Sequence, residues 1–300
     1  MEPEVRAALA AIPELAGTDL DGLASERLGG LTNRVYRVGD WCLRLPGQGT
    51  EAYIDRKVEA VNARAAAAAG VSPEVVFVDP ASGVMLTRYV PGTVTMTPEQ
   101  FRGRPGAPER AGALFRRLHD RAGRFDFRFE LFAMIDSYLK VLADLRTELP
   151  SGYHATVAEA EIVRRALAAR TWPLSPCHCD PLCENFLDAG DRMWLVDWEY
   201  SGMNDPMWDL GDLSVEAGFD AAQDEALLQG YFGAAVAPED RARMVIYKAM
   251  CDLLWTLWGL IQHGNGNPAD DFWAYAVNRF ERCKALMATP AFAASVATIG

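Results

Sequence analysis

The sequence has no excess of positive charge and no long unbroken apolar segment. Among its 300 residues 41 are acidic and 29 are basic, which gives a formal net charge of −12. Binding to nucleic acid or to an anionic membrane requires a basic face, so this charge argues against both functions, although it is compatible with a cationic substrate. The longest apolar run, residues 244–261, is interrupted by Lys248 and Asp252 and is not expected to span a membrane.

The chain also lacks a recognisable signal peptide, a Walker phosphate-binding loop, internal repeats and low-complexity segments. Three of its six cysteines, Cys177, Cys179 and Cys183, lie within seven residues of one another. Unpaired thiols are typical of a reducing compartment, so we expect a cytoplasmic protein. Half of the residues are apolar, and a chain of this length can bury a large core and form two lobes.

The most informative stretch runs from His178 to Asp197. It contains His178-x-Asp180, then Asn185 five residues after that aspartate, and Asp197 at the end of a short apolar run. This is the order of groups in a kinase catalytic loop followed by its metal-binding aspartate. Asp180 precedes Pro181 in a loop and is placed to accept a proton from an attacking hydroxyl, whereas we expect His178 to brace the loop.

Two short apolar segments, residues 185–187 and 193–196, flank a turn that contains Gly190. They predict a hairpin in which Asn185 lies roughly opposite Asp197, at a spacing that suits two oxygen ligands of Mg²⁺. Asp209, one turn into a later helix that Asp205 would cap, is expected to accept backbone N–H groups from the catalytic loop.

An alternative for the same stretch is a zinc site built on Cys177, Cys179 and Cys183. Their spacing is not usual for structural zinc, and no second Cys/His pair follows nearby. We therefore favour free, partly buried thiols.

Residues 1–90 show strand patterns and one long helix, and we expect them to form a nucleotide-binding lobe. A Gly-Gly turn runs into the strand at residues 34–38, and its backbone and side chains can approach a phosphate, although such a turn is also typical of a simple hairpin. The residues concerned are Gly29, Gly30, Leu31, Thr32 and Asn33.

Arg44 lies between apolar residues of a second strand, so its charge requires a partner. Glu59, fifteen residues later on a helix predicted over residues 51–69, is the expected partner, because kinase-like lobes hold a phosphate contact in this way. An exposed helix charge is the alternative for Glu59. Strands at residues 75–78 and 84–87 follow, and the backbone of Arg88, Tyr89 and Val90 is expected to be free to bind an adenine edge.

Residues 91–300 are mainly helical in pattern and are expected to form a catalytic and substrate-binding lobe. Helices are predicted over residues 108–123, 130–149 and 155–169, and two long helices over 238–263 and 268–287 are expected to close the chain. His119 is expected to be a structural histidine. Trp255, Trp258 and Tyr275 on the last two helices either form aromatic faces that hold a quaternary ammonium or pack in the core.

Taken together, these motifs resemble the choline/ethanolamine kinase family, within the aminoglycoside phosphotransferase and protein-kinase-like superfamily. The resemblance extends from about Ser25 to Leu286 and includes Asp197-Trp198-Glu199-Tyr200 and Trp255-x-x-Trp258. It implies an α+β, bilobal protein-kinase-like fold, with a small N-terminal lobe of antiparallel sheet plus one long helix and a larger, mainly helical C-terminal lobe. It also implies ATP and Mg²⁺ as cofactors, and a monomer or homodimer.

By motif, Asp180 resembles the catalytic base, Asn185 and Asp197 resemble the Mg²⁺ ligands, and Arg44 resembles the phosphate-contacting cation. Trp255, Trp258 and Tyr275 resemble aromatic residues of the choline site, which Tyr200 would border. Glu199 belongs to the motif but receives no role. Eukaryotic members have an asparagine after the Asp-Ile-Gly that follows the metal motif, and this sequence has Asp212 there, after Asp209-Leu210-Gly211.

The expected function is ATP-dependent phosphorylation of the hydroxyl of a small cationic amino alcohol, with choline first and ethanolamine next. The alternatives are a thiamine or aminoglycoside kinase of the same superfamily, a nucleotide-binding scaffold without catalysis, and a zinc-binding interaction module.

Overall fold

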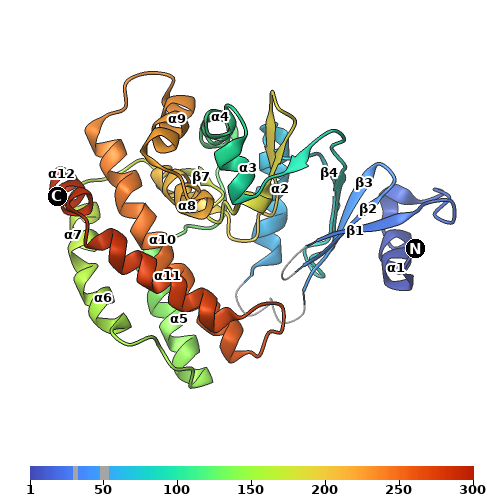
Figure 1. Cartoon of the computed structure of the whole chain (residues 1–300). Coiled ribbons are helices and arrows are strands. Elements are labelled where there is room, and N and C mark those ends of the chain that lie inside the picture. The colour runs from blue at the N-terminus through green and yellow to red at the C-terminus, as the bar shows by residue number, and fades with distance from the viewer. Residues whose placement is uncertain (30–32, 48–53) are drawn as a thin grey trace.

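The computed structural model describes residues 1–29, 33–47 and 54–300, and it has a sheet-rich N-terminal part and a helical C-terminal part (Figure 1). The N-terminal part contains a five-stranded antiparallel sheet in the order β1-β2-β3-β5-β4. Its strands are β1 (Ser25–Gly29), β2 (Arg34–Val38), β3 (Trp41–Leu45), β4 (Val75–Val78) and β5 (Met85–Arg88).

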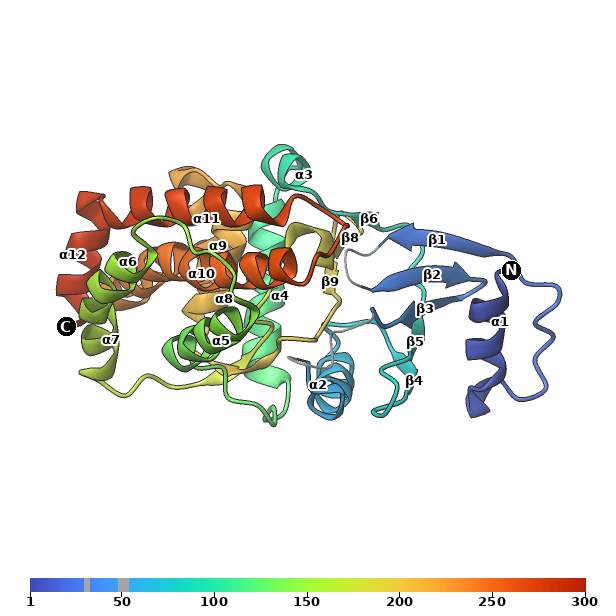
Figure 2. The ribbon, with the colours of Figure 1, turned by 90° about the horizontal axis from the view of Figure 1, so that it is seen from below.

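Alternating apolar residues explain why this sheet is stable. Leu43 and Leu45 on β3 and Tyr36 and Val38 on β2 are buried in a cluster of their own, which includes Val5 and Leu9 of helix α1 (Pro3–Ala10). The alternation places these side chains on one face, as expected for a half-buried strand. Figure 2 shows α1 at the far end of the sheet, away from the helical part.

Helix α2 (Arg56–Ala68) lies between the sheet and the rest of the molecule (Figure 1). Asp55 begins this helix because its side chain accepts hydrogen bonds from the backbone N–H groups of Lys57 and Val58. The sequence predicted a helix from residue 51, and residues 51–53 lie outside the described part of the chain.

The C-terminal part contains two smaller sheets. Strands β8 (Phe186–Asp188) and β9 (Met193–Leu195) form the predicted hairpin, and β6 (Val94–Thr95) adds to its edge. Strand β7 (Ser175–Cys177) pairs with β10 (Gly202–Asn204). Both ends of the stretch from β7 to β10 are therefore fixed by strand pairing, which positions the loop between them.

Helices make up the rest of the C-terminal part. They are α3 (Pro98–Gly103), α4 (Ala107–Arg121), α5 (Leu131–Leu145), α6 (Tyr153–Glu159), α7 (Glu161–Ala168), α8 (Met207–Ala217), α9 (Ala221–Phe232), α10 (Pro238–Gly264), α11 (Phe272–Met287) and α12 (Pro290–Ile299). Helix α10 packs against α5, α8, α11 and α12. It is the one described helix that is long and apolar enough to cross a membrane, and 83% of its apolar window is buried inside the protein.

Several element boundaries differ from those predicted. The helix predicted over residues 155–169 is two helices that meet at Ala160, and the last predicted helix begins only at Phe272, after Asp271 caps it through the N–H of Ala274. Helix α12 follows, so the chain does not close with two long helices. The α+β, bilobal protein-kinase-like fold is confirmed, whereas the division between residues 90 and 91 stays a prediction.

Candidate active site

The loop after β7 is held in place by Asp209 of helix α8. One oxygen of Asp209 accepts a hydrogen bond of 2.8 Å from the backbone N–H of His178, and the other accepts one of 2.8 Å from the N–H of Cys179. Cys179 has φ 68°, a left-handed conformation that a non-glycine residue adopts only when its surroundings impose it. The prediction that Asp209 supports the catalytic loop is confirmed.

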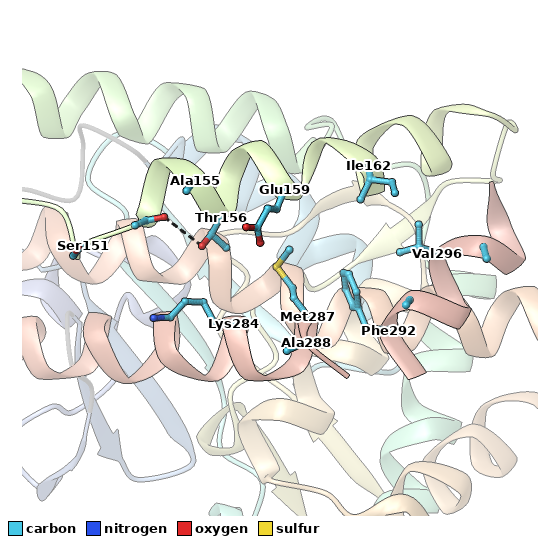
Figure 3. Close-up of a pocket in the computed structure, with 13 residues that line it drawn as sticks. Ser151, Ala155, Thr156, Glu159, Ile162, Lys284, Met287, Ala288, Phe292 and Val296 are labelled. Atoms are coloured by element: carbon cyan, nitrogen blue, oxygen red, sulfur yellow. Dashed lines mark hydrogen bonds between the residues drawn. The ribbon is translucent and has the colours of Figure 1, made fainter. Parts of the chain in front are cut away.

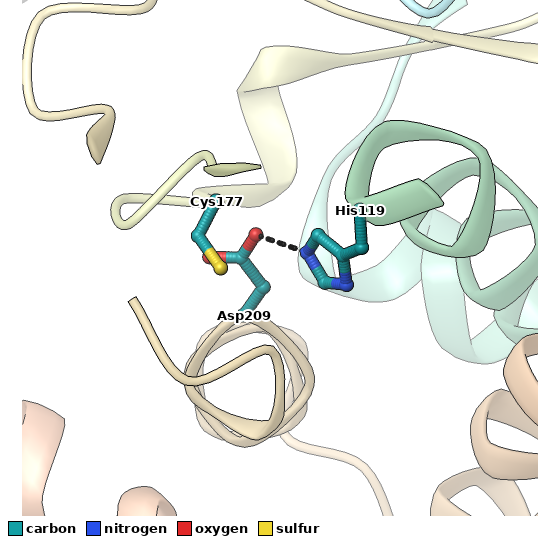
Figure 4. A group of neighbouring side chains, drawn as sticks. All are labelled: His119, Cys177 and Asp209. Atoms are coloured by element: carbon teal, nitrogen blue, oxygen red, sulfur yellow. Dashed lines mark hydrogen bonds and ion pairs between the residues drawn. The ribbon is translucent and has the colours of Figure 1, made fainter. Parts of the chain in front are cut away.

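His119 completes this support from helix α4. Its Nε2 lies 3.0 Å from Asp209 (Figure 4). Its Nδ1 lies 3.0 Å from the hydroxyl of Tyr231, and its ring stacks on Phe115. Both ring nitrogens therefore have partners inside the protein. The expectation of a structural histidine at this position is confirmed.

Cys177 lies beside His119 and Asp209, and the three ligand atoms are within 4.8 Å of one another (Figure 4). Burial raises the pKa of the Cys177 thiol well above its ordinary value, which disfavours the thiolate that a metal would need. Within residues 1–29, 33–47 and 54–300, no metal-ligating group of three combines Cys177 with Cys179 or Cys183. These three cysteines are buried and form no disulfide among the described residues, whereas the sequence predicted thiols that are only partly buried.

His178 braces the loop, as predicted. Its Nε2 lies 2.9 Å from the carbonyl oxygen of Val196, and its ring packs edge-on against Trp198 at 4.9 Å. Burial lowers the pKa of His178, so the ring is neutral and donates to that carbonyl. The contact ties the catalytic loop to the chain immediately before Asp197.

The β8–β9 hairpin brings Asn185 and Asp197 to the same end of the sheet. The backbone N–H of Val196 donates to the carbonyl of Asn185 at 3.0 Å, so Asn185 lies opposite Val196, one residue from the predicted partner. The turn residue Gly190 has φ 95°, as the prediction required. Nδ2 of Asn185 donates to the backbone oxygen of Asp180 at 3.1 Å, and this orients the amide and links two of the three predicted catalytic residues.

Arg44 on β3 and Glu59 on α2 form the buried ion pair that the sequence predicted. The same guanidinium lies 3.5 Å from Asp197 and 3.5 Å from Glu199, and it also donates to the carbonyl of Gly83 at 3.1 Å. The basic residue of the sheet is thereby placed beside the predicted metal aspartate. Asp197 itself has φ 69°, and its side chain is 37% exposed.

Glu199, which received no role from the sequence, is a shared acceptor between the two parts of the molecule. It accepts hydrogen bonds from Arg56 of α2 and from Asn33 at 2.9 Å, in addition to its contact with Arg44. Arg56 also pairs with Glu59 at 2.8 Å. The sequence did not indicate this role for Arg56, because nothing local shows which distant carboxylate it contacts.

The predicted phosphate loop is described only at its ends. Gly30, Leu31 and Thr32 lie outside the described residues. Gly29 ends strand β1, and Oδ1 of Asn33 accepts a hydrogen bond of 3.1 Å from the N–H of Gly47. The phosphate contact of this loop stays a prediction.

The connector at Arg88, Tyr89 and Val90 is more constrained than predicted. The N–H of Arg88 donates to the carbonyl of Glu74, and the N–H of Tyr89 donates to that of Asp40, both at 2.9 Å. The prediction that this backbone is free was wrong for these two N–H groups, because strand pairing and a turn use them. A nucleotide contact from this segment stays a prediction.

The predicted aromatic residues meet in two edge-to-face pairs. Tyr200 and Trp255 have ring centroids 5.2 Å apart, and Trp258 and Tyr275 are 5.7 Å apart. Trp255 is buried, whereas the other three are half-buried. The guanidinium of Arg279 lies 4.6 Å from the centre of the Tyr275 ring, so part of that ring already contacts a cation of the protein.

Sequence reasoning missed a buried group of charges beside these rings. Glu216 of α8 and Asp252 of α10 lie 2.6 Å and 3.2 Å from Arg279 of α11. Arg282 lies 2.6 Å from Asp252. Burial, together with the negative charge of Glu216, raises the pKa of Asp180 to about 7. The only signal in the sequence was Asp252, an acidic residue within the apolar run 244–261. It was interpreted only as a residue that interrupts this run.

A separate cavity of about 650 Å³ lies between α6–α7 and α11–α12 (Figure 3). It is lined mainly by apolar side chains such as Ile162, Met287 and Phe292. None of the predicted site residues lines it, so it is not part of the candidate active site.

The chain is similar to known phosphotransferases. Residues 24–247 match the model of the phosphotransferase enzyme family, APH. The crystal structure of a choline/ethanolamine kinase family protein from Mesorhizobium loti is 65% identical, with a TM-score of 0.91 over 99% of this chain and 98% of that one.

Two further proteins are more distant. Choline kinase LicA from Streptococcus pneumoniae is 25% identical, with a TM-score of 0.78 over 95% of this chain and 98% of its own. Ethanolamine kinase 2 from Mus musculus is 26% identical over 80% of this chain and 68% of its own. The chain is therefore a phosphotransferase with an alcohol group as acceptor, and it belongs to the phosphotransferase enzyme family, within which it is a choline/ethanolamine kinase family member.

Proposed function

We propose that the protein transfers the γ-phosphoryl group of ATP, with Mg²⁺, to the hydroxyl of a small cationic amino alcohol, for which choline and ethanolamine are the candidates. The observation that carries the proposal is the position of Arg44. It is paired with Glu59 of the N-terminal part and lies 3.5 Å from Asp197 of the C-terminal part, which is where a triphosphate and its metal would meet.

The residues present fit a magnesium ion. Asp197 offers a partly exposed carboxylate, while Glu59 and Glu199 nearby are already engaged by arginines. The amide nitrogen of Asn185 is used by Asp180, which leaves its side-chain oxygen available. Hard oxygen ligands of this kind suit Mg²⁺, which when bound would neutralise charge on the phosphate oxygens.

In this proposal Asp180 accepts the proton of the substrate hydroxyl. Its raised pKa, about 7, makes it a stronger base than an exposed aspartate and keeps it near the pH at which the proton must be taken. Arg44 orients the phosphates, and Glu59 and Glu199 fix the direction of its guanidinium. Positioning and fixed charge, with no covalent intermediate on the protein, supply the rate acceleration.

The test is a coupled ADP-release assay over choline, ethanolamine, thiamine and kanamycin with saturating MgATP. Turnover that depends on choline or ethanolamine supports the proposal. ADP release that depends only on thiamine or kanamycin would show that the substrate is not a small amino alcohol but belongs to the class of the compound that is turned over. Binding of MgATP without turnover of any alcohol would favour a scaffold.

A further inference from the structure

Asp212 on α8 has a buried carboxylate oxygen with no hydrogen-bond partner among the described residues. Its Oδ2 accepts a hydrogen bond of 3.2 Å from the indole N–H of Trp255, whereas no donor in the described parts of the chain reaches Oδ1. The residue is 0% exposed. A buried carboxylate oxygen without a donor is unfavourable, so a donor is expected to reach it in the working state.

The surroundings of Asp212 place it within the candidate active site. The charges of Glu216 and Asp180, after burial itself, are the main influences that raise its pKa well above the ordinary value. Asp180 is the proposed base, and Trp255 is one of the predicted substrate-binding aromatic residues. The hydrogen bond from the Trp255 indole therefore places Asp212 beside one of the predicted substrate-binding rings.

Charge balance around this position favours a cation that donates hydrogen bonds. Glu216 and Asp252 are compensated by Arg279 and Arg282, whereas no cationic side chain of the described residues forms an ion pair with Asp212. The Tyr275 ring, which a quaternary ammonium would use, already contacts Arg279 at 4.6 Å.

We propose that Asp212 Oδ1 accepts a hydrogen bond from an N–H of the substrate ammonium, an inference that rests on the proposed function. The enzyme would then select amino alcohols whose nitrogen keeps at least one N–H. Ethanolamine and its mono- and dimethyl derivatives satisfy this oxygen. Choline carries the same charge and hydroxyl but has no N–H, so it leaves the oxygen unpaired in its complex. A site built around a hydrogen bond rejects an analogue that lacks the donor much more strongly than a methyl-sized change in an apolar site would.

The experiment compares kcat/KM for ethanolamine, N-methylethanolamine, N,N-dimethylethanolamine and choline with the full chain and saturating MgATP. The expected result is a step at the last methyl group, with choline at least about tenfold below the dimethyl compound. A gradual change of kcat/KM along the series would indicate steric fit instead of a hydrogen bond and would contradict the inference. A kcat/KM for choline equal to or above that of the dimethyl compound would also overturn it, while leaving the proposed function intact. If none of the four alcohols is phosphorylated, both the inference and the proposed function are contradicted.

Asp212→Asn provides a second measurement. The indole of Trp255 requires an acceptor, so the asparagine carbonyl would face it and the NH₂ group would replace Oδ1. The ratio of choline to dimethylethanolamine kcat/KM is then expected to rise at least about tenfold, with KM for ATP unchanged. The matched control is Glu281→Gln on the exposed face of α11, where Lys284 is the partner of Glu281 among the described residues, and it should leave the ratio unaltered. An unchanged ratio in a folded Asp212→Asn protein would contradict the inference.

Discussion

Asn33 donates a hydrogen bond of 2.9 Å to Glu199, which lies 166 residues farther along the chain. The bond joins the beginning of strand β2 to the segment just after the predicted metal aspartate. Glu199 is only 6% exposed in its side chain, and Arg44 and Arg56 approach the same carboxylate. One acidic residue thereby connects the sheet, helix α2 and the catalytic segment.

Replacing Glu199 with glutamine should weaken both stability and nucleotide binding. Loss of one acidic partner costs up to about 3–5 kcal/mol, because Arg44 and Arg56 stay buried and then share Glu59 as their remaining partner. We expect Tm to fall by roughly 5 °C or more, and KM for ATP to rise at least about tenfold, since Arg44 loses its fixed direction. Calorimetry and initial rates check this. Glu225→Gln, which removes an exposed pair with Arg241, is the control and should change neither quantity measurably.

Replacing Asp209 with asparagine should loosen the catalytic loop. An amide can accept through only one atom, so one of the N–H groups of His178 and Cys179 loses its acceptor. We expect kcat to fall at least about tenfold, with a loss of about 1–3 kcal/mol in the free energy of unfolding. Denaturant melts and steady-state kinetics measure the two effects. A variant with normal kcat would show that the loop does not need Asp209.

Gly259 on α10 allows close approach of α11 at Tyr275. A Cβ at this position would lie 2.6 Å from a ring carbon of Tyr275, which is too close for the helices to keep their spacing. Gly259→Ala should therefore raise KM for the alcohol several-fold while KM for ATP stays the same. Gly123→Ala is the matched control, because nothing lies within 4 Å of its Cβ position. An equal rise in both KM values would point to general unfolding.

Asp188 should make stability depend on pH. Its burial opposes ionisation, but hydrogen bonds from Arg110, the N–H of Gly190 and Arg104 outweigh it, so the pKa of Asp188 is lower in the folded protein than in the unfolded chain. The unfolded chain binds the proton first, so the stabilisation is complete above the ordinary aspartate pKa and is lost as the pH falls through the folded value. Tm measured from pH 7 to pH 3 should fall less steeply in Asp188→Asn than in the wild type. Parallel curves would contradict this assignment.

The site residues that lie close together in the sequence were predictable, whereas the contacts between residues from distant segments were not. His178, Asp180, Asn185 and Asp197 occur in one stretch whose turn chemistry indicates a hairpin, so their spacing carries geometric information. The pairing of Arg44 with Glu59 could be inferred because a charge in an apolar strand requires a partner.

Other features depend on distant contacts that no local pattern encodes. Glu216, Arg279 and Asp252 come from three different helices, and their mutual contacts exist only after those helices pack. Similarly, the N–H groups of Arg88 and Tyr89 looked free because their acceptors, on Glu74 and Asp40, lie in other segments. The break at Ala160 interrupts a run of good helix formers, so propensity predicted one helix instead of two.

Asp180→Asn should separate binding from chemistry. The amide cannot take the hydroxyl proton, so kcat should fall at least about a hundredfold, while the affinity for MgATP measured by calorimetry should be nearly unchanged. Wild-type turnover in this variant would remove Asp180 from the role of base.

The most direct measurement of phosphoryl transfer to an amino alcohol is ³¹P NMR of a reaction that contains the protein, MgATP and ethanolamine, with choline in a parallel sample. The wild type should convert the γ-phosphate signal of ATP into that of a phosphomonoester, and Asp197→Asn should abolish the conversion because it removes the proposed metal ligand. Release of inorganic phosphate without any phosphomonoester in either sample, or full conversion by Asp197→Asn, would contradict the account.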